Sequence, residues 1–277
     1  MPELEEIVSA VAASKKYRSI CIDTIGRIAE RELASRGNVK AAAKATKRRL
    51  HQVYGAFEQE FDYEAAYQRL EVAYKLVSDD EIKAACRHVL GQHSSTRERL
   101  PILDPFYRDI FEITGQPALL LDLGCGLNPL ALPWMGLVPG QDPEQVPSIR
   151  YVPLDIDADR VRFLNRYLAL AGLEPLARCQ DILSHPPGDA ADVALLLKMS
   201  PTLERQEPGS TLGLIEQIRA PYVVVSFAVK SLGGREKGMV EHYRQQFLGW
   251  LKDRQWPAEK LAFDSELVVI VRRKPEA

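Results

Sequence analysis

Hydrophobic positions divide the 277-residue chain into two parts with different periodicity. Up to about residue 113, apolar residues recur at intervals of three and four, the spacing that places side chains on one face of a helix. From residue 118 onward, short apolar runs alternate with amphipathic stretches, as in βαβ units around a mostly parallel sheet. The pattern predicts an N-terminal all-helical region over residues 1–113 and an α/β domain over residues 114–277.

Local signals refine the helical part. Asn38 can cap a helix that runs through Gln52 and beyond, because its side chain can accept bonds from the first free backbone N–H groups. A second helix is expected over residues 63–76, and Asp79 or Asp80 can cap the next one. The apolar stripe of the first helix steps by four and three and consists of Val39, Ala43, Thr46, Leu50, Val53 and Phe57.

The second part contains five apolar runs that read as strands. They are separated by amphipathic segments such as residues 159–171, which favours a Rossmann-like sheet. Residues 133–147 carry four prolines and look like a loop insertion. The predicted strands cover residues 118–123, 151–154, 193–197, 222–227 and 267–271.

Composition adds few constraints. Hydrophobic residues make up 46% and charged residues 27% of the chain, as in ordinary globular enzymes. The four cysteines form no CxxC pair, and none has a histidine at the spacing of a zinc site, so we expect a reduced protein without metal. The N-terminus has no apolar signal segment, and no run reaches the ~20 apolar residues of a membrane span. A cytoplasmic protein is the expectation.

Charge is distributed unevenly. Residues 7–57 contain eleven Lys or Arg and three acids, a net charge of +8, although the whole chain carries −2. Such an asymmetry predicts a polyanionic partner for the N-terminal part.

The strongest motif follows the first predicted strand. There the chain reads Asp122-Leu123-Gly124-Cys125-Gly126, an acid followed by a glycine-rich turn that lets the backbone approach a ligand closely. Pro129 stands where a dinucleotide-binding motif needs its third glycine, which argues against NAD. The DxGxG pattern is instead that of S-adenosylmethionine-dependent methyltransferases.

Two further acids follow the next strands. Asp155 ends the second strand, where a carboxylate can accept both ribose hydroxyls. Asp181, in Gln180-Asp181-Ile182, is taken to end a further strand between the runs at residues 151–154 and 193–197, near the expected place of an adenine amino group. One such acid could be an ordinary loop residue, but three in this order favour a cofactor site.

Two features that are missing from the chain restrict the choice of methyl acceptor. Residues 197–201 read Leu-Lys-Met-Ser-Pro, without the Asn/Asp-Pro-Pro-aromatic motif usual for exocyclic amines. Methylation of pyrimidine C5 needs a cysteine nucleophile, and no cysteine lies beyond Cys179. A ring nitrogen with a free lone pair, such as guanine N7, needs no base, so positioning alone can catalyse the transfer. The absence of both features is therefore consistent with methylation of guanine N7.

Six segments in the chain are far more specific than a general methyltransferase motif. They are residues 13–17 (ASKKY), 93–100 (HSSTRERL), 124–131 (GCGLNPLA), 198–204 (KMSPTLE), 226–227 (SF) and 231–239 (SLGGREKGM). In sequence and order they resemble the aminoglycoside-resistance 16S rRNA (guanine-N7) methyltransferases of the Arm/Rmt type, and the resemblance spans nearly the whole chain. One departure is Ala228, where relatives commonly have proline.

The resemblance implies a cofactor pocket for S-adenosyl-L-methionine. Arg99 would pair with the methionyl carboxylate of the cofactor, a bidentate contact that suits arginine. It implies no certain catalytic residue, but Lys198 and Glu204 are candidates for positioning. Together with the motif residues Asp122 and Gly126, the implied pocket consists of Phe57, His93, Ser94, Ser95, Arg99, Gly124, Asp155, Asp181, Ile182, Leu197 and Gln206.

The N-terminal helices resemble the ribosome-docking extension of the same family. Their cations would contact phosphates and position the enzyme on folded RNA without reading sequence. Arg235 and Lys237 could clamp the target, and Met239 could pack on a guanine pulled out of its stack. The docking clusters are Lys15, Lys16 and Arg18, and Lys40, Lys44, Lys47, Arg48 and Arg49.

The function implied is methylation of guanine N7 in the decoding site of 16S rRNA, within the assembled 30S subunit, by a monomeric enzyme that confers aminoglycoside resistance. By the same resemblance, protection should concern mainly the 4,6-disubstituted drugs. Two alternatives stay open. One is methylation of another RNA base, such as adenine N1 of the decoding site, and the other is a non-catalytic RNA-binding protein of the same fold.

Overall fold

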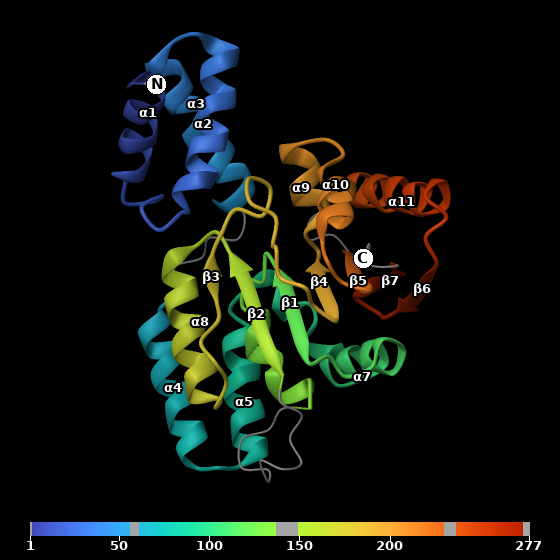
Figure 1. Ribbon diagram of the computed structural model, residues 1–277. Coiled ribbons are helices and arrows are strands. Elements are labelled where there is room, and N and C mark those ends of the chain that lie inside the picture. The colour runs from blue at the N-terminus through green and yellow to red at the C-terminus, as the bar shows by residue number, and fades with distance from the viewer. Residues whose placement is uncertain (1, 56–60, 137–148, 230–236, 274–277) are drawn as a thin grey trace.

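A seven-stranded sheet forms the centre of the molecule (Figure 1). The computed structural model describes residues 2–55, 61–136, 149–229 and 237–273. The strand order is β3-β2-β1-β4-β5-β7-β6; neighbours from β3 to β5 pair in parallel, and β7 runs antiparallel to β5 and β6. The strands are β1 (Leu119–Leu123), β2 (Arg150–Asp155), β3 (Arg178–Cys179), β4 (Val193–Leu197), β5 (Tyr222–Ala228), β6 (Ala258–Ala262) and β7 (Glu266–Arg272).

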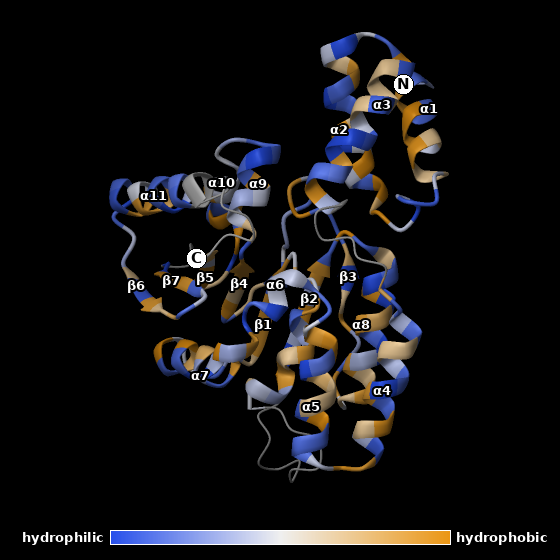
Figure 2. Cartoon of the chain, turned by 180° about the vertical axis from the view of Figure 1, so that it is seen from behind, coloured by the Kyte–Doolittle hydropathy of each residue, from blue (hydrophilic) through white to orange (hydrophobic). Residues whose placement is uncertain are grey.

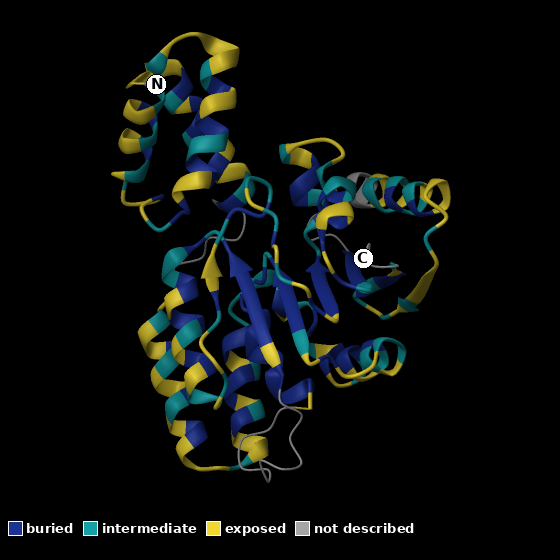
Figure 3. Cartoon of the chain, in the orientation of Figure 1, coloured by how far each residue is buried: buried dark blue, intermediate teal, exposed yellow. Residues whose placement is uncertain are grey.

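Both faces of the sheet are buried, which explains the continuous apolar runs of the central strands. On β1, Leu120 belongs to one hydrophobic core, whereas Leu121 and Leu123 point into the other. Figure 3 shows β1, β2 and β4 largely buried between helical layers. The first core packs beneath α4 (Tyr63–Lys75), α5 (Asp79–Leu90), α7 (Leu103–Thr114) and α8 (Ala158–Leu170), and the second beneath α9 (Ser200–Gln206), α10 (Ser210–Gln217) and α11 (Lys237–Asp253).

The helices show the amphipathic pattern that such layers require. Hydrophobic and hydrophilic residues alternate along α4 and α5 (Figure 2). Asp62 caps α4 by accepting from the backbone N–H groups of Glu64 and Ala65. Ser78 caps α5 by accepting from the backbone N–H of Glu81, so the expected Asp79 and Asp80 caps were wrong by one or two residues.

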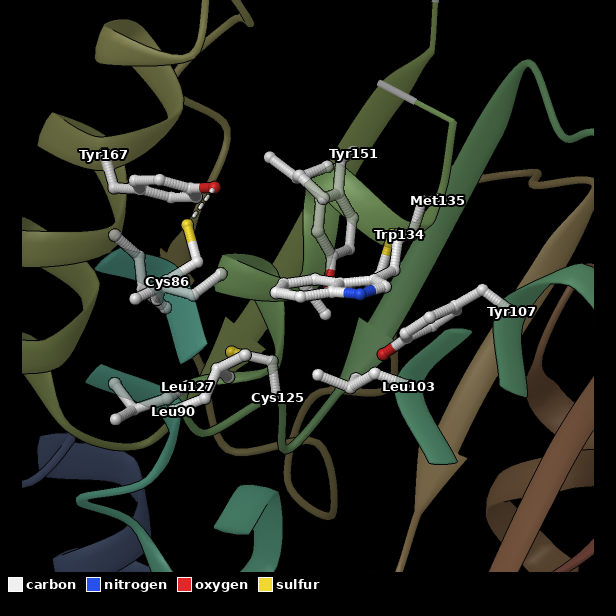
Figure 4. Close-up of a cluster of buried hydrophobic side chains, with 14 of the residues drawn as sticks. Cys86, Leu90, Leu103, Tyr107, Cys125, Leu127, Trp134, Met135, Tyr151 and Tyr167 are labelled. Atoms are coloured by element: carbon white, nitrogen blue, oxygen red, sulfur yellow. Dashed lines mark hydrogen bonds between the residues drawn. The ribbon is translucent and has the colours of Figure 1, made fainter. Parts of the chain in front are cut away.

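Aromatic side chains fill the core between β2, α5 and α7 (Figure 4). Cys125 and Leu127, from the segment after β1, are buried in the same cluster. On its other side the Tyr167 hydroxyl lies 3.6 Å from Cys86 Sγ. This packing anchors the turn after β1 from below, since close-packed cores resist displacement.

Three N-terminal helices form a separate unit, α1 (Pro2–Ala12), α2 (Ile22–Arg36) and α3 (Val39–Leu50), followed by a π-helical turn at His51–Gly55. Asn38 caps α3 by accepting from the backbone N–H of Ala41, as predicted. Ala42, Ala45 and the predicted Thr46 and Leu50 are buried in α3, whereas the predicted Val39, Ala43 and Val53 are partly buried. Phe57 lies outside the described residues.

The helical unit is joined to the sheet above the carboxyl end of β2. The Cys21 backbone N–H donates to the Ile156 carbonyl over 2.7 Å, and the Ala158 N–H donates to the Ser19 carbonyl over 2.7 Å. Ile156 also packs against the core of the unit. The unit therefore lies beside the edge of the sheet where parallel strands end.

The packing divides the chain differently from the predicted domains. Helices α4, α5 and α7 share their core with β1, β2 and β4, whereas α1–α3 have a core of their own. The three helices α1–α3 therefore form a packing unit of their own, and the helices after them belong to the core of the sheet. In Figure 1 the three helices stand together, apart from α4 and α5.

Candidate functional site

One cavity opens at the carboxyl ends of β1, β2 and β4, where the strand order reverses between β1 and β4. Ligands of open α/β sheets bind at such a switch point. The cavity measures about 230 Å³. Its lining includes most of the predicted cofactor residues, namely His93, Ser94, Ser95, Arg99, Asp122, Gly124, Gly126, Asp155, Asp181, Ile182, Leu197 and Gln206, together with Lys198.

The glycine turn forms the floor of this cavity. Gly124 and Gly126 have φ values of 69° and 54°, in the left-handed region that glycine adopts without strain. A Cβ on Gly124 would lie 2.6 Å from the Met199 side chain, so a larger residue would have to displace that side chain as well as adopt a strained φ. The backbone N–H of Gly124 donates to the Leu154 carbonyl over 2.9 Å, which ties the turn to β2.

Asp122 is buried beneath the turn. Its Oδ2 accepts from the Tyr151 hydroxyl at 2.5 Å and from Asn128 Nδ2 at 2.9 Å. Burial raises the pKa of Asp122 to about 6, although both hydrogen bonds act to lower it. The carboxylate therefore stays mostly ionised at neutral pH and orders the polar groups below the cavity.

Asp155, at the end of β2, is held by several donors. The Gly126 N–H donates to Oδ2 at 2.9 Å and the Asp157 N–H to Oδ1 at 3.0 Å. Arg160 donates from Nη1 to both oxygens, at 3.0 and 3.1 Å. The carboxylate is therefore fixed at the cavity wall, where ribose hydroxyls would have to share its oxygens.

Asp181 and Gln206 meet at another wall of the cavity. Both accept from Arg27 of α2, the Asp181 Oδ2 at 2.8 Å and the Gln206 Oε1 at 2.9 Å. The second oxygen of Asp181 accepts the N–H groups of Leu183 and Ser184. The helical unit thus supplies a side chain to this wall.

Arg99 is fully enclosed, with 2% of its surface exposed. Its Nε and Nη2 donate to Glu266 at 3.0 and 2.7 Å, and its Nη1 donates to Asn128 Oδ1 at 2.8 Å. The fork expected to meet a cofactor carboxylate is therefore engaged by Glu266. One hydrogen on each terminal nitrogen is left for a ligand, because guanidinium carries five donors.

Lys198 follows β4 in a left-handed conformation with φ 59°. Its Nζ donates to the Ser95 carbonyl at 3.0 Å and to Glu98 at 2.8 Å, and lies 3.4 Å from Glu266. Burial acts to raise the pKa of Glu266, but the charges of Arg99 and Lys198 outweigh it and keep that pKa low. Lys198 thus positions the segment that carries Ser95.

His93 begins the short helix α6 (Ser94–Arg97). Its ring lies over the glycine turn, because a Cβ on Gly126 would be 3.5 Å from His93 Cε1. Burial and the nearby Arg160 and Lys198 lower the pKa of His93 to about 3, so the ring is neutral at physiological pH. A neutral imidazole beside the cavity can accept or donate without adding charge.

Glu204 has a different place from the one expected. Its carboxylate accepts from the backbone N–H of Gly209 at 2.7 Å and of Thr211 at 2.8 Å. Among the described residues, the cavity lining on α9 includes Leu203 and Gln206 but not Glu204. Glu204 therefore holds the connection from α9 to α10 in this structure, and its role in positioning the substrate stays a prediction.

The predicted docking cations lie on the helical unit. Lys15, Lys16 and Arg18 are exposed in the segment before α2, and Lys40, Lys44, Arg48 and Arg49 are exposed on α3, with Lys47 partly buried. The two clusters adjoin, because the Tyr17 hydroxyl donates to the Lys47 carbonyl at 2.9 Å. Lys16 Nζ also lies 3.2 Å from His51 Nδ1.

Not all of these cations are equally available. Arg49 pairs with the buried Glu32 at 3.4 Å, so it has a structural partner within the unit. Arg235 lies outside the described residues. Lys237 and Met239 lie on α11, but their side chains are not described. Their proposed contacts with the target remain predictions.

Three residues of the site escaped the sequence reasoning: Arg27, Arg160 and Glu266. A signal existed for Arg160, which lies one turn into the helix after Asp155 and can reach back to it. Glu266 is 167 positions from Arg99 and Arg27 is 154 positions from Asp181, so no local spacing indicates either pair.

The described residues provide neither a metal cluster nor a membrane-spanning helix. Within the described ranges, no three His, Cys, Asp or Glu side chains are grouped so that they could hold a metal ion. Likewise, none of the described helices has the length and apolar character needed to cross a bilayer.

The side chains that line the cavity fit S-adenosylmethionine. Carboxylates line the walls where ribose and adenine would lie, and a buried arginine is present for the methionyl carboxylate. Leu197 and Ile182 contribute apolar surface at the same edge. A nucleoside joined to an amino acid needs this sequence of acceptors, apolar surface and a cation.

Comparisons with known proteins agree with this geometry. The family model described as ribosomal RNA methyltransferase (FmrO) matches residues 13–271. A 16S rRNA (guanine(1405)-N(7))-methyltransferase of Micromonospora echinospora is 38% identical over 98% of this chain and 97% of its own length. A protein of the same name from Serratia marcescens is 34% identical over 98% of both chains.

Solved structures include a close match in fold. The 16S rRNA methyltransferase RmtF, solved in complex with S-adenosyl-L-homocysteine, has a TM-score of 0.79 and 33% identity, with 98% of both chains covered. An rRNA methylase from Escherichia coli has a TM-score of 0.76 and 27% identity, covering 98% of this chain and all of its own. The chain belongs to the FmrO family of ribosomal RNA methyltransferases.

Proposed function

We propose that the protein transfers a methyl group from S-adenosyl-L-methionine to N7 of guanine 1405 in 16S rRNA, as its full-length relatives are named to do. The observation that carries the proposal is the cavity at the strand ends, lined by Asp155, Asp181 and Arg99 and bordered by the basic helical unit. We further propose that it acts as a monomer on the assembled 30S subunit. Such a substrate implies the cytoplasm.

The reaction needs neither a nucleophile nor a base from the protein. The bound cofactor supplies a methyl group attached to a positively charged sulfur. Guanine N7 has a free lone pair, so its bond to the methyl carbon forms as the sulfur–carbon bond breaks, and no base removes a proton. Rate enhancement then comes from holding the two reactants in line.

The described residues supply that positioning in separate ways. Asp155 and Asp181 would orient the nucleoside, and Arg99 would orient the amino-acid end. Lys198 holds the Ser95 segment through its bond to the Ser95 carbonyl. Leu197 exposes only 8% of its surface and would help to exclude water from the reacting atoms.

The basic surface on α3 and residues 15–18 would hold the enzyme on the subunit. Lysine and arginine contacts to phosphates give affinity and orientation without sequence specificity. Specificity for one guanine then depends on the shape of the assembled RNA, which fits recognition of folded RNA by its surface.

Drug susceptibility of a sensitive bacterium that expresses the chain tests this function in cells. We expect resistance to 4,6-disubstituted aminoglycosides and retained sensitivity to 4,5-disubstituted ones. Resistance to both classes would favour adenine N1 of the decoding site. An unchanged response, together with no binding of S-adenosylhomocysteine by the purified protein, would favour a non-catalytic RNA-binding role.

A further inference from the structure

Arg27 connects the helical unit to the cofactor cavity. It lies on α2, yet its guanidinium reaches Asp181 at the sheet edge, with Nε at 3.0 Å and Nη2 at 2.8 Å from Oδ2. The Nη2 atom also donates to Gln206 Oε1 at 2.9 Å. Thr24 and Tyr54 line the same cavity from the helical unit.

These contacts use all the acceptor capacity of Asp181. A carboxylate offers about four lone-pair positions, two on each oxygen. On Oδ1 they accept the N–H groups of Leu183 and Ser184, at 2.9 and 3.2 Å. On Oδ2 they accept the two N–H groups of Arg27. A further donor from a ligand can bind Oδ2 only by displacing part of the arginine fork.

Arg27 differs from Arg160, the other arginine on a cavity carboxylate. Arg160 is enclosed within the sheet domain, with 8% exposure, and contacts Asp155 and Asp157 on its own side of the junction. The Arg27 side chain is 22% exposed and reaches across the junction. Asp181 is itself buried, with 3% of its side chain exposed, so Arg27 can move toward solvent only when another donor replaces it on the carboxylate. Arg160 has no such exposed path.

We propose that Arg27 is a residue of the adenine subsite that competes with the adenine 6-amino group for Oδ2 of Asp181. The inference rests on the proposed cofactor and deepens it. A neutral amino group must replace a charged donor, which forms the stronger hydrogen bond. Arg27 thus weakens binding of a 6-amino purine, while its freed N–H groups favour a purine with an acceptor at position 6.

The test compares two ligands by isothermal titration calorimetry. S-adenosylhomocysteine carries the 6-amino group, and S-inosylhomocysteine carries a 6-oxo group in its place. Arg27→Met keeps the aliphatic stem and removes all donors. We expect this variant to bind S-adenosylhomocysteine about fivefold more tightly and S-inosylhomocysteine more weakly, so that the affinity ratio rises about tenfold or more.

Two further variants separate competition from general damage. Arg36→Met removes an arginine of the same helix that pairs with Glu32, away from the cavity, and should leave the ratio unchanged. Arg27→Lys keeps a charge with fewer donors and should give an intermediate ratio. It also keeps the proposal testable if Arg27→Met does not fold.

The outcomes are distinct. The proposed competition is overturned if the affinity ratio of the two ligands stays at the wild-type value in Arg27→Met and in Arg27→Lys. It is also overturned if both folded variants bind S-adenosylhomocysteine more weakly than the wild-type protein. Failure of the wild-type protein to bind S-adenosylhomocysteine at all would instead refute the proposed cofactor.

Discussion

Buried charges beneath the cavity are neutralised by partners from distant parts of the chain. Arg99 and Lys198 share Glu266, and Asn128 links Arg99 to Asp122. Isolated charges would be costly in this environment, so each group depends on the others. The network holds the segment before α7, the glycine turn and β7 in one arrangement.

Glu266→Gln tests how much this network contributes to the free energy of unfolding. Removing one member of a buried ion pair leaves Arg99 and Lys198 without their shared counter-charge, and such changes typically cost about 3–5 kcal/mol. We expect a loss of this size in the free energy of unfolding measured with urea. Glu259→Gln is the matched control, because Glu259 pairs with Arg272 on the exposed face of β6 and should change stability by less than about 1 kcal/mol. Equal effects would contradict the network.

Asp122→Asn tests the raised pKa of the carboxylate below the glycine turn. The folded pKa of about 6 exceeds the reference value of 3.8, so the folded state binds the proton more tightly and loses stability as pH rises between these values. Asparagine keeps an acceptor but does not titrate. The stability of the variant relative to wild type should therefore rise by about 1 kcal/mol from pH 5 to pH 7.5.

Urea unfolding at each pH measures this difference. A constant difference across the range would show that Asp122 titrates near its ordinary value in the folded protein.

Single residues were predictable where the backbone brings them together. Asp122 and Asp155 lie at the carboxyl ends of the neighbouring parallel strands β1 and β2, which share one edge of the sheet. Arg99 was placed at the cavity by resemblance, but its partner Glu266 lies on an antiparallel strand far along the chain. Packing between distant elements chooses such partners, and sequence spacing does not record it.

Elements with a strong apolar pattern were predicted well. The expected strand over residues 193–197 matches β4, and four others agree with the structure within one residue at each end. Strand β3 has two residues and both are exposed, so no apolar run marks it. Strand β6 is largely exposed and contains Glu259 and Lys260, which hide it from a hydrophobic pattern.

The basic face of α3 is the element we expect to carry ribosome affinity. Lys44→Glu combined with Arg48→Glu reverses two exposed charges and leaves the Arg49–Glu32 pair intact. Affinity for the 30S subunit should fall at least tenfold, and the slope of log affinity against log salt should lessen by roughly one per lost phosphate contact. Binding of S-adenosylhomocysteine should not change.

Arg69→Glu with Lys75→Glu provides the control. Both residues are exposed on α4, which lies away from the helical unit in Figure 1. If the substitutions on α4 lower the affinity for the 30S subunit as much as those on α3, the loss reflects the change in overall charge. The docking surface would then lie elsewhere.

The whole molecule places the cavity and the basic helical unit on one side. The helical unit is fastened above β2 by the Cys21–Ile156 and Ser19–Ala158 backbone bonds, and Arg27 extends it to the cavity. An RNA held on α3 would therefore lie beside the carboxyl edge of the sheet. Composition and periodicity predicted a helical N-terminal region and an α/β domain, with a boundary at residue 113. They did not indicate the junction of α1–α3 with the sheet, because it depends on backbone contacts between segments that have no sequence signature.

Mapping the modified nucleotide tests whether the protein methylates N7 of guanine 1405. Unmethylated 30S subunits are incubated with the enzyme and S-adenosylmethionine, and the rRNA is reduced, cleaved at N7-methylguanine and read by primer extension. We expect a new, cofactor-dependent stop caused by scission at guanine 1405, the position named for the relatives. Methyl incorporation without scission at that guanine, or scission at another position, would contradict it.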